Sequence, residues 1–175
     1  MSLQLIFVVE TNKKCNSDWI YIKDTIEHFY SYEQTMVKFT PVYMDGKGKY
    51  KNKEKQIEKL IAKYKAGGKN NETRVIYCFD CDEYNTKQED AEFLKMARQY
   101  CEAKAYDFVW FDKDIECVYT GEKVKDSEKK KRATVFKAKK EIDFVKPQRL
   151  STMNYQENSS NLMLILDKYL TRKRK

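Results

Sequence analysis

The sequence predicts an α/β fold in which helices flank a mainly parallel sheet. Short runs of apolar, β-branched and aromatic residues recur along the chain, and the longer segments between them repeat apolar residues at three- and four-residue steps. Strands that alternate with helices of this length form right-handed βαβ units, whose strands are parallel. The longest apolar runs have only the length of a strand, so the sequence predicts no transmembrane helix.

The first predicted strand covers 3–9, an uninterrupted apolar run of the kind that is buried on both faces of a parallel sheet. A helix is predicted over 17–30, because apolar residues recur along one face and Ser17 can cap its first turn. The next strand, 37–44, contains Pro41, which cannot donate a ladder hydrogen bond. The sequence therefore places this strand at an edge of the sheet or at a bulge.

Two further helix–strand pairs follow in the middle of the chain. A helix over 52–65 has one apolar face and is stopped by a pair of glycines, and an apolar strand follows at 74–79. A second helix is predicted over 87–104 and a fourth strand over 106–111. The helix between each strand and the next predicts that the strands are parallel.

The order of elements is less regular in the last third of the chain. The segment 115–119 fits either a short helix or a strand, and the lysine-rich stretch 122–140 fits either a charged loop or a helix. An amphipathic helix is predicted over 161–170. The segment 121–160 is therefore expected to be an insertion or a mobile region.

Positive charge is concentrated in this last third. The 175 residues carry 35 Lys and Arg against 27 Asp and Glu, a net charge of +8. Residues 121–175 alone hold 16 basic and 7 acidic residues, whereas residues 1–120 are nearly balanced. We therefore divide the chain into an α/β core over 1–120 and a basic segment over 121–175, whose final helix packs on the core within one domain overall. Such a segment indicates a polyanionic partner, most often nucleic acid, although a solvated lysine-rich surface fits the same composition.

The cysteines and the start of the chain predict a cytoplasmic protein with reduced thiols. The five cysteines are an odd number without the spacing of a secreted scaffold, and the first residues lack the basic and apolar regions of a signal peptide. Cys78 and Cys81 form a CxxC pair that overlaps a strand end, which favours packing of Cys78 in the core over zinc or redox chemistry.

Acidic residues follow two of the predicted strands directly. Glu10 comes after the first strand, and Asp80 and Asp82 come after the third. Parallel sheets bind ligands beyond the carboxyl ends of their strands, and an i, i+2 pair in extended backbone points to one side. If these two strands are neighbours, about 5 Å separates them. Three carboxylates that close repel one another, so the pattern predicts a site for Mg²⁺ or Mn²⁺ suited to phosphoryl chemistry. Aspartates that merely cap the next helix are the competing explanation.

These residues resemble the Toprim fold, the metal-binding catalytic domain of topoisomerases, bacterial primases and related nucleases. The finer resemblance is to RloB-like proteins, a Toprim-related group associated with prokaryotic restriction and phage-defence loci. Glu10 closes the first strand as in that group, although Thr11 stands where the group has glycine. The segment 75–82, Val-Ile-Tyr-Cys-Phe-Asp-Cys-Asp, resembles the strand that ends in DxD, and 110–119 resembles a later apolar stretch that contains a glutamate.

The resemblance implies a Rossmann-like core of Toprim type and metal-dependent cleavage of nucleic acid. It assigns Glu10 to metal binding or acid–base catalysis, Asp80 and Asp82 to metal binding, and Glu116 to a supporting carboxylate. The implied cofactor is Mg²⁺ or Mn²⁺, and a separate ATPase or another defence component is an implied partner.

Six basic residues are the candidates for contacts with a nucleic-acid backbone. Two of them follow Glu10 in the chain, and four form one run in the basic segment: Lys13, Lys14, Lys129, Lys130, Lys131 and Arg132.

Two other functions fit the same residues. The first is a non-catalytic module of the same fold that binds nucleic acid or a partner protein, which the replacement of glycine by Thr11 favours. The second is a phosphotransferase or phosphatase acting on a small molecule, which predicts a closed pocket instead of an open basic groove.

Overall fold

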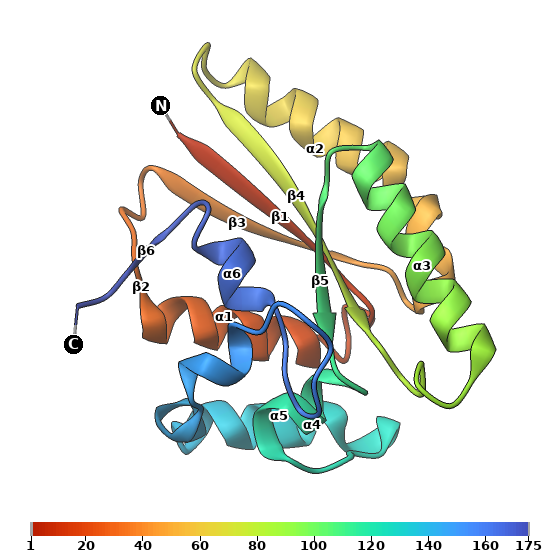
Figure 1. Cartoon of the computed structure of the whole chain (residues 1–175). Helices are drawn as coiled ribbons and strands as arrows, with labels where there is room; N and C mark the ends of the chain where they lie inside the picture. Colours follow the sequence, from red (N-terminus) through yellow and green to blue (C-terminus); the bar gives the residue numbers. More distant parts are fainter. Residues whose placement is uncertain (1, 175) are drawn as a thin grey trace.

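The computed structural model describes residues 2–174. Its centre is a sheet of four parallel strands in the order β3-β1-β4-β5, so the predicted parallel sheet is confirmed. Figure 1 shows the four strands running side by side between two layers of helices. The strands of this sheet are β1 (Leu3–Val9), β3 (Val37–Tyr43), β4 (Glu72–Asp80) and β5 (Asp107–Phe111).

Helices cover both faces of the sheet (Figure 1). One face carries α2 (Glu54–Ala66) and α3 (Gln88–Ala103), and the other carries α1 (Ser17–Phe29), α4 (Ile115–Thr120), α5 (Lys129–Ala138) and α6 (Leu162–Leu166). The connections contain the 3₁₀ helices η1 (Lys47–Lys53), η2 (Asp126–Glu128), η3 (Glu141–Phe144) and η4 (Pro147–Leu150). Within residues 2–174, no helix has the length and the apolar composition needed to span a bilayer.

Strand β1 lies in the interior because it has a strand on each side and a helical layer on each face. Its side chains alternate: Phe7 and Val9 enter the core beneath α1, whereas Ile6 and Val8 enter the core beneath α2 and α3. All four are fully buried, which explains the uninterrupted apolar run in the sequence. The edge position predicted from Pro41 is also confirmed, because β1 is the only strand of the described chain that pairs with β3.

The segment 121–160 packs into the core, contrary to the expected insertion or mobile region. It forms α5, η3 and η4, and it buries Phe136 and Leu150 completely. The Phe136 ring lies 5.0 Å from the ring of Tyr21 on α1 and 5.7 Å from that of Tyr119 on α4. The sequence pattern does not reveal these contacts, because the apolar residues of this segment are mixed with lysines and follow no regular helical or strand period.

The end of the chain also differs from the prediction. The helix expected over 161–170 ends at Leu166, and Thr171–Arg172 forms strand β6, which pairs antiparallel with β2 (Tyr30–Ser31). The Tyr30 hydroxyl donates a hydrogen bond to the carboxylate of Asp167, the residue at which the chain leaves the helix. The C-terminal segment is thereby joined to the end of α1.

Candidate carboxylate site

The site is built where β1 and β4 end side by side. These two strands are paired in parallel, as predicted, so their carboxyl ends lie at the same edge of the sheet. Glu10 follows β1, and its Oε1 accepts a hydrogen bond from the backbone N–H of Asp80 at 2.8 Å. The two acidic residues expected to meet at this edge therefore do so.

Asp80 is held in the interior at the end of β4. Its side chain is on the α1 side of the sheet, following the alternation that places Ile76 and Cys78 in that core. The residue is 7% exposed, and its Oδ1 accepts a hydrogen bond from the N–H of Ile115, the first residue of α4, at 3.0 Å. Asp80 thus fixes the start of α4 while its carboxylate stays away from water.

A fourth carboxylate, which the sequence prediction missed, belongs to Asp18 in the first turn of α1. Asp18 is 5% exposed, and its Oδ2 accepts a hydrogen bond from the N–H of Thr11 at 3.1 Å. Acidic residues are common in the first turn of a helix because they interact favourably with its dipole. Because an acidic residue at this position already has that explanation, the sequence does not indicate that Asp18 lies beside Glu10.

Glu116 is the most deeply buried acid of the group. It lies in α4, is 0% exposed, and neither of its carboxylate oxygens has a hydrogen-bond partner among residues 2–174. The nearest cation is the ammonium of Lys129 at the start of α5, with Nζ 3.5 Å from Oε2 of Glu116. Lys129 was predicted to contact nucleic acid, but its side chain is only 19% exposed and faces the acidic residues, apart from a second ion pair with Asp126.

Burial and mutual repulsion oppose ionisation of these acids. Burial, reinforced by the charge of Asp18, raises the pKa of Glu10 from 4.5 to about 8, although the Asp80 N–H opposes the shift. Burial and the charges of Glu10 and Asp18 raise the pKa of Asp80 well above its ordinary value. Burial raises the pKa of Glu116 to about 7 despite the nearby charge of Lys129. In the metal-free protein these acids therefore favour their protonated forms, and full ionisation of the group needs a compensating positive charge.

Asp82 differs from the other predicted ligands in its backbone conformation and in its ion pair. Its φ angle is 49°, in the left-handed region, and its N–H donates to the carbonyl of Lys113 at 2.7 Å. The backbone is therefore not extended after β4, and the expectation that Asp80 and Asp82 face the same side is wrong. The Asp82 carboxylate instead pairs with Lys47 of η1, whose ammonium also lies 3.3 Å from Asp90 of α3.

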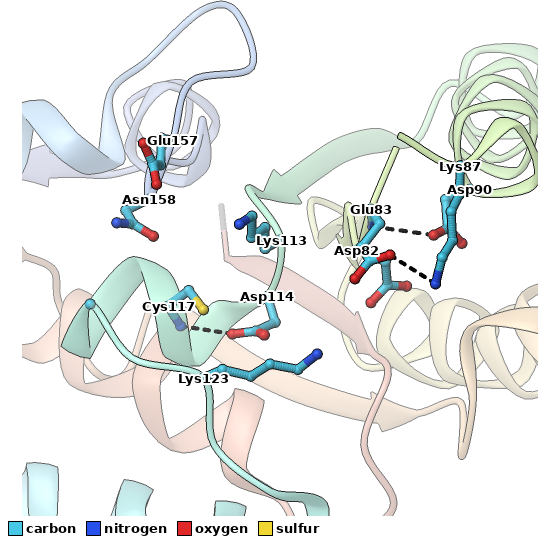
Figure 2. Close-up of a pocket in the computed structure, with 11 residues that line it drawn as sticks. Asp82, Glu83, Lys87, Asp90, Lys113, Asp114, Cys117, Lys123, Glu157 and Asn158 are labelled. Carbon is cyan, nitrogen blue, oxygen red and sulfur yellow. Dashed lines mark hydrogen bonds and ion pairs between the residues drawn. The ribbon is translucent and has the colours of Figure 1, made fainter. Parts of the chain in front are cut away.

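Asp82 lines a different hollow from Glu10, Asp18 and Asp80. The smaller, of about 360 Å³, contains Glu10, Asp18, Asp80 and Lys129. The larger, of about 600 Å³, contains Asp82 and is the hollow drawn in Figure 2. Figure 2 shows that three parts of the chain line this hollow. They are the segment from the end of β4 into α3, the segment from the end of β5 through α4 to Lys123, and the loop that carries Glu157 and Asn158.

The donors in the smaller hollow fit a hard divalent cation in chemistry and charge. The carboxylates of Glu10, Asp18 and Asp80 are hard oxygen ligands, and the buried Glu116 nearby has two oxygens without a hydrogen-bond partner in the described chain. Across residues 2–174, however, no three His, Cys, Asp or Glu side chains converge closely enough to form a ready metal cage. Lysines pair instead with Glu116 and Asp82.

The remaining basic candidates lie around this edge in different environments. Lys13 and Lys14 are exposed in the loop after Glu10, and Nζ of Lys130 donates to the carbonyl of Lys14 at 2.6 Å. Lys131 is exposed on α5. Arg132 is engaged within the fold, because both of its terminal nitrogens donate to Glu141, at 2.7 and 3.2 Å.

Fold and site together define an α/β protein with a buried carboxylate cluster at the carboxyl edge of a parallel sheet. No protein-family model matches the chain, and comparison with curated proteins and with solved structures gives no match either.

Proposed function

We propose that the chain is a Toprim-like, RloB-like hydrolase that uses Mg²⁺ or Mn²⁺ to cleave phosphodiester bonds in nucleic acid. One observation carries the proposal. Four acidic residues gather at the ends of two adjacent strands, and the only ion pair that any of them makes in the described chain is the one between Glu116 and Lys129: Glu10, Asp18, Asp80 and Glu116. Because uncompensated buried charge is costly, the cluster favours a divalent cation.

The roles of the residues follow from their places in the cluster. Glu10, Asp80 and Asp18 would hold the cation, with Glu116 as a supporting carboxylate and Asp82 at the border with the larger hollow. A bound Mg²⁺ activates water and stabilises the leaving oxygen of a phosphodiester. The alternative role that the resemblance implies for Glu10 is acid–base catalysis, for which its pKa of about 8 in the metal-free protein is suited.

Support for a nucleic-acid substrate comes from the basic residues beside the cluster. Lys13, Lys14 and Lys130 are exposed and are brought together by the contact between Lys130 and the Lys14 carbonyl. We refer to these three residues as the basic rim. Exposed lysines in the loop that follows β1 can hold a phosphate backbone while the carboxylate cluster acts on it. The family resemblance extends the proposal to phage defence, with a separate ATPase as partner.

The test is cleavage of DNA and RNA by the purified chain with Mg²⁺, with Mn²⁺ and with chelator. We expect cleavage with either metal, none with chelator, and none in Asp80→Asn. The asparagine keeps an oxygen that accepts the Ile115 N–H, so the fold should survive. Asp112→Asn is the matched control, because Asp112 is also buried after a strand and accepts the N–H of Asn158 at 3.0 Å, but outside the cluster. Cleavage that persists in chelator or in Asp80→Asn contradicts the proposal.

A non-catalytic nucleic-acid-binding module is the second candidate. The observation that favours it is that lysines already pair with two of the predicted ligands, Glu116 and Asp82, and that no metal cage is formed among residues 2–174. This candidate predicts salt-sensitive binding of DNA or RNA without cleavage in Mg²⁺ or Mn²⁺. A chain that hydrolyses small phosphate esters but binds no nucleic acid would exclude both functions.

A further inference from the structure

Lys129 occupies an unusual position for a residue in a lysine-rich run. It is the first residue of α5, and its neighbours Lys130 and Lys131 are exposed. Its own ammonium is turned inward, 3.5 Å from a carboxylate oxygen of the fully buried Glu116. Lys129 also lines the hollow that contains Glu10, Asp18 and Asp80.

The surroundings of Lys129 are those of a bound cation. The charges of Glu116, Asp80 and Asp18 together outweigh the desolvation of the ammonium, so the pKa of Lys129 is raised and the side chain stays charged. Both Glu116 oxygens lack a hydrogen-bond partner in the described chain, so the ammonium of Lys129 is the main group that compensates their charge. Removing a partner from a buried ion pair leaves an expensive unpaired charge.

We propose that Lys129 is a built-in cation, whose ammonium takes a place in the carboxylate cluster that a divalent metal ion would otherwise fill. Neutralising it therefore adds one divalent ion to the number that the chain binds. The inference deepens the proposed function, since it sets how many metal ions the cluster accepts. The inference does not require catalysis, because it concerns only the number of divalent ions that the chain binds before and after Lys129 is neutralised.

The experiment is titration of the purified full chain with Mn²⁺ alone, followed by calorimetry and by the electron paramagnetic resonance signal of free Mn²⁺. Lys129→Met should bind one more Mn²⁺ per chain than the wild type. Lys131→Met is the matched control, since it removes an exposed lysine two positions along α5 and should leave the stoichiometry unchanged. In the double variant Lys129→Met, Glu116→Gln, the extra ion should be lost, because the carboxylate that it would neutralise is gone.

The stoichiometry decides between two outcomes. One added ion in Lys129→Met supports the proposal, whatever number the wild type binds. If the wild type binds none, the proposed metal-dependent function is wrong but Lys129 is still the built-in cation. Equal stoichiometry in Lys129→Met and the wild type overturns the proposal, whether or not the wild type binds metal. If Lys129→Met folds only when Mn²⁺ is added, as followed by circular dichroism, the proposal is supported. If it remains unfolded in millimolar Mn²⁺ while the double variant folds without metal, the divalent ion does not replace the ammonium and the proposal is overturned.

Discussion

Glu10 links the ends of two strands, and its surroundings oppose the ionisation of its carboxyl group. Its Oε1 accepts the Asp80 N–H, a hydrogen bond that either protonation state of the side chain can accept. Burial and the charge of Asp18 nevertheless favour the neutral form. The same side chain therefore stabilises the strand ends when neutral and destabilises the metal-free protein when ionised.

This conflict predicts how stability depends on pH. Because the pKa of Glu10 is raised from 4.5 to about 8 on folding, the folded protein holds a proton that the unfolded chain loses. The stability that this gives is complete below about pH 4.5 and is lost as the pH rises through 8, by up to about 1.4 kcal/mol per pH unit. Glu10→Gln fixes a neutral acceptor, so in chelator it should match the wild type near pH 5 and exceed it at pH 9 in denaturant unfolding. Glu58→Gln, at an exposed position of α2, is the control. Parallel pH profiles for Glu10→Gln and the wild type would contradict the prediction.

The sequence predicts some residues of the site and misses others for physical reasons. Glu10 and Asp80 follow apolar strands directly, so their meeting depends only on the neighbouring positions of β1 and β4. Asp82 departs from the extended backbone because its φ angle is positive, which is uncommon for a residue other than glycine and which the sequence pattern does not indicate. Asp18 and Lys129 join the cluster because α1 and α5 pack together, and the spacing of residues along the sequence does not predict that packing.

At the scale of elements, some basic residues of α5 pair with buried or partly buried acids, and others are exposed to solvent. Lys129 and Arg132 pair with acids of the fold, Glu116 and Glu141, whereas Lys130 reaches the loop between β1 and α1. A run of like charges in the sequence is thus not one basic surface in the structure. The exposed positive charge at the site comes from the basic rim, which two separate elements supply.

The basic rim leads to a prediction about salt dependence. Replacing Lys13, Lys14 and Lys130 together by glutamine should weaken binding to DNA and RNA, because fewer phosphates are neutralised and fewer counterions are released. The slope of log affinity against log salt should become shallower by about 0.7–0.9 for each phosphate that is no longer neutralised. The measurement is fluorescence anisotropy at several salt concentrations. A matched triple variant of exposed lysines on α2, across the sheet, should leave affinity nearly unchanged: Lys55, Lys59 and Lys63. Equal slopes for the two triple variants would reject the rim as the binding surface.

At the scale of the whole molecule, the basic segment and the α/β core share one interior. The core beneath α1 contains side chains of β1, β4 and β5 together with those of α5, α6, η3 and η4. The sequence predicts the sheet well, because strands and their helices alternate with clear periodicity. It does not predict β2 and β6, because two-residue strands show no period and their pairing joins distant parts of the chain.

A shared interior predicts one cooperative unfolding transition. Phe136→Ala, within the basic segment, should lower the free energy of unfolding by about 3–5 kcal/mol, because it leaves a cavity against Tyr21 and Tyr119. Phe144→Ala is the same change at a residue that is 84% exposed, and it should alter stability little. Far- and near-ultraviolet circular dichroism should follow a single transition in both variants. Separate transitions for the core and the basic segment would show instead that they fold independently.

The antiparallel pairing of β2 with β6 has a consequence for the time at which this protein becomes folded during its synthesis. Residues 30–31 leave the ribosome early, but their partners, residues 171–172, are made about 140 positions later. The apolar face of α1 likewise cannot be fully buried until the residues of α4, α5 and α6 have been synthesised. Until those residues emerge, the nascent chain exposes surface that favours aggregation and chaperone binding. The fold is therefore completed late in translation, although its central strand is the first to be made.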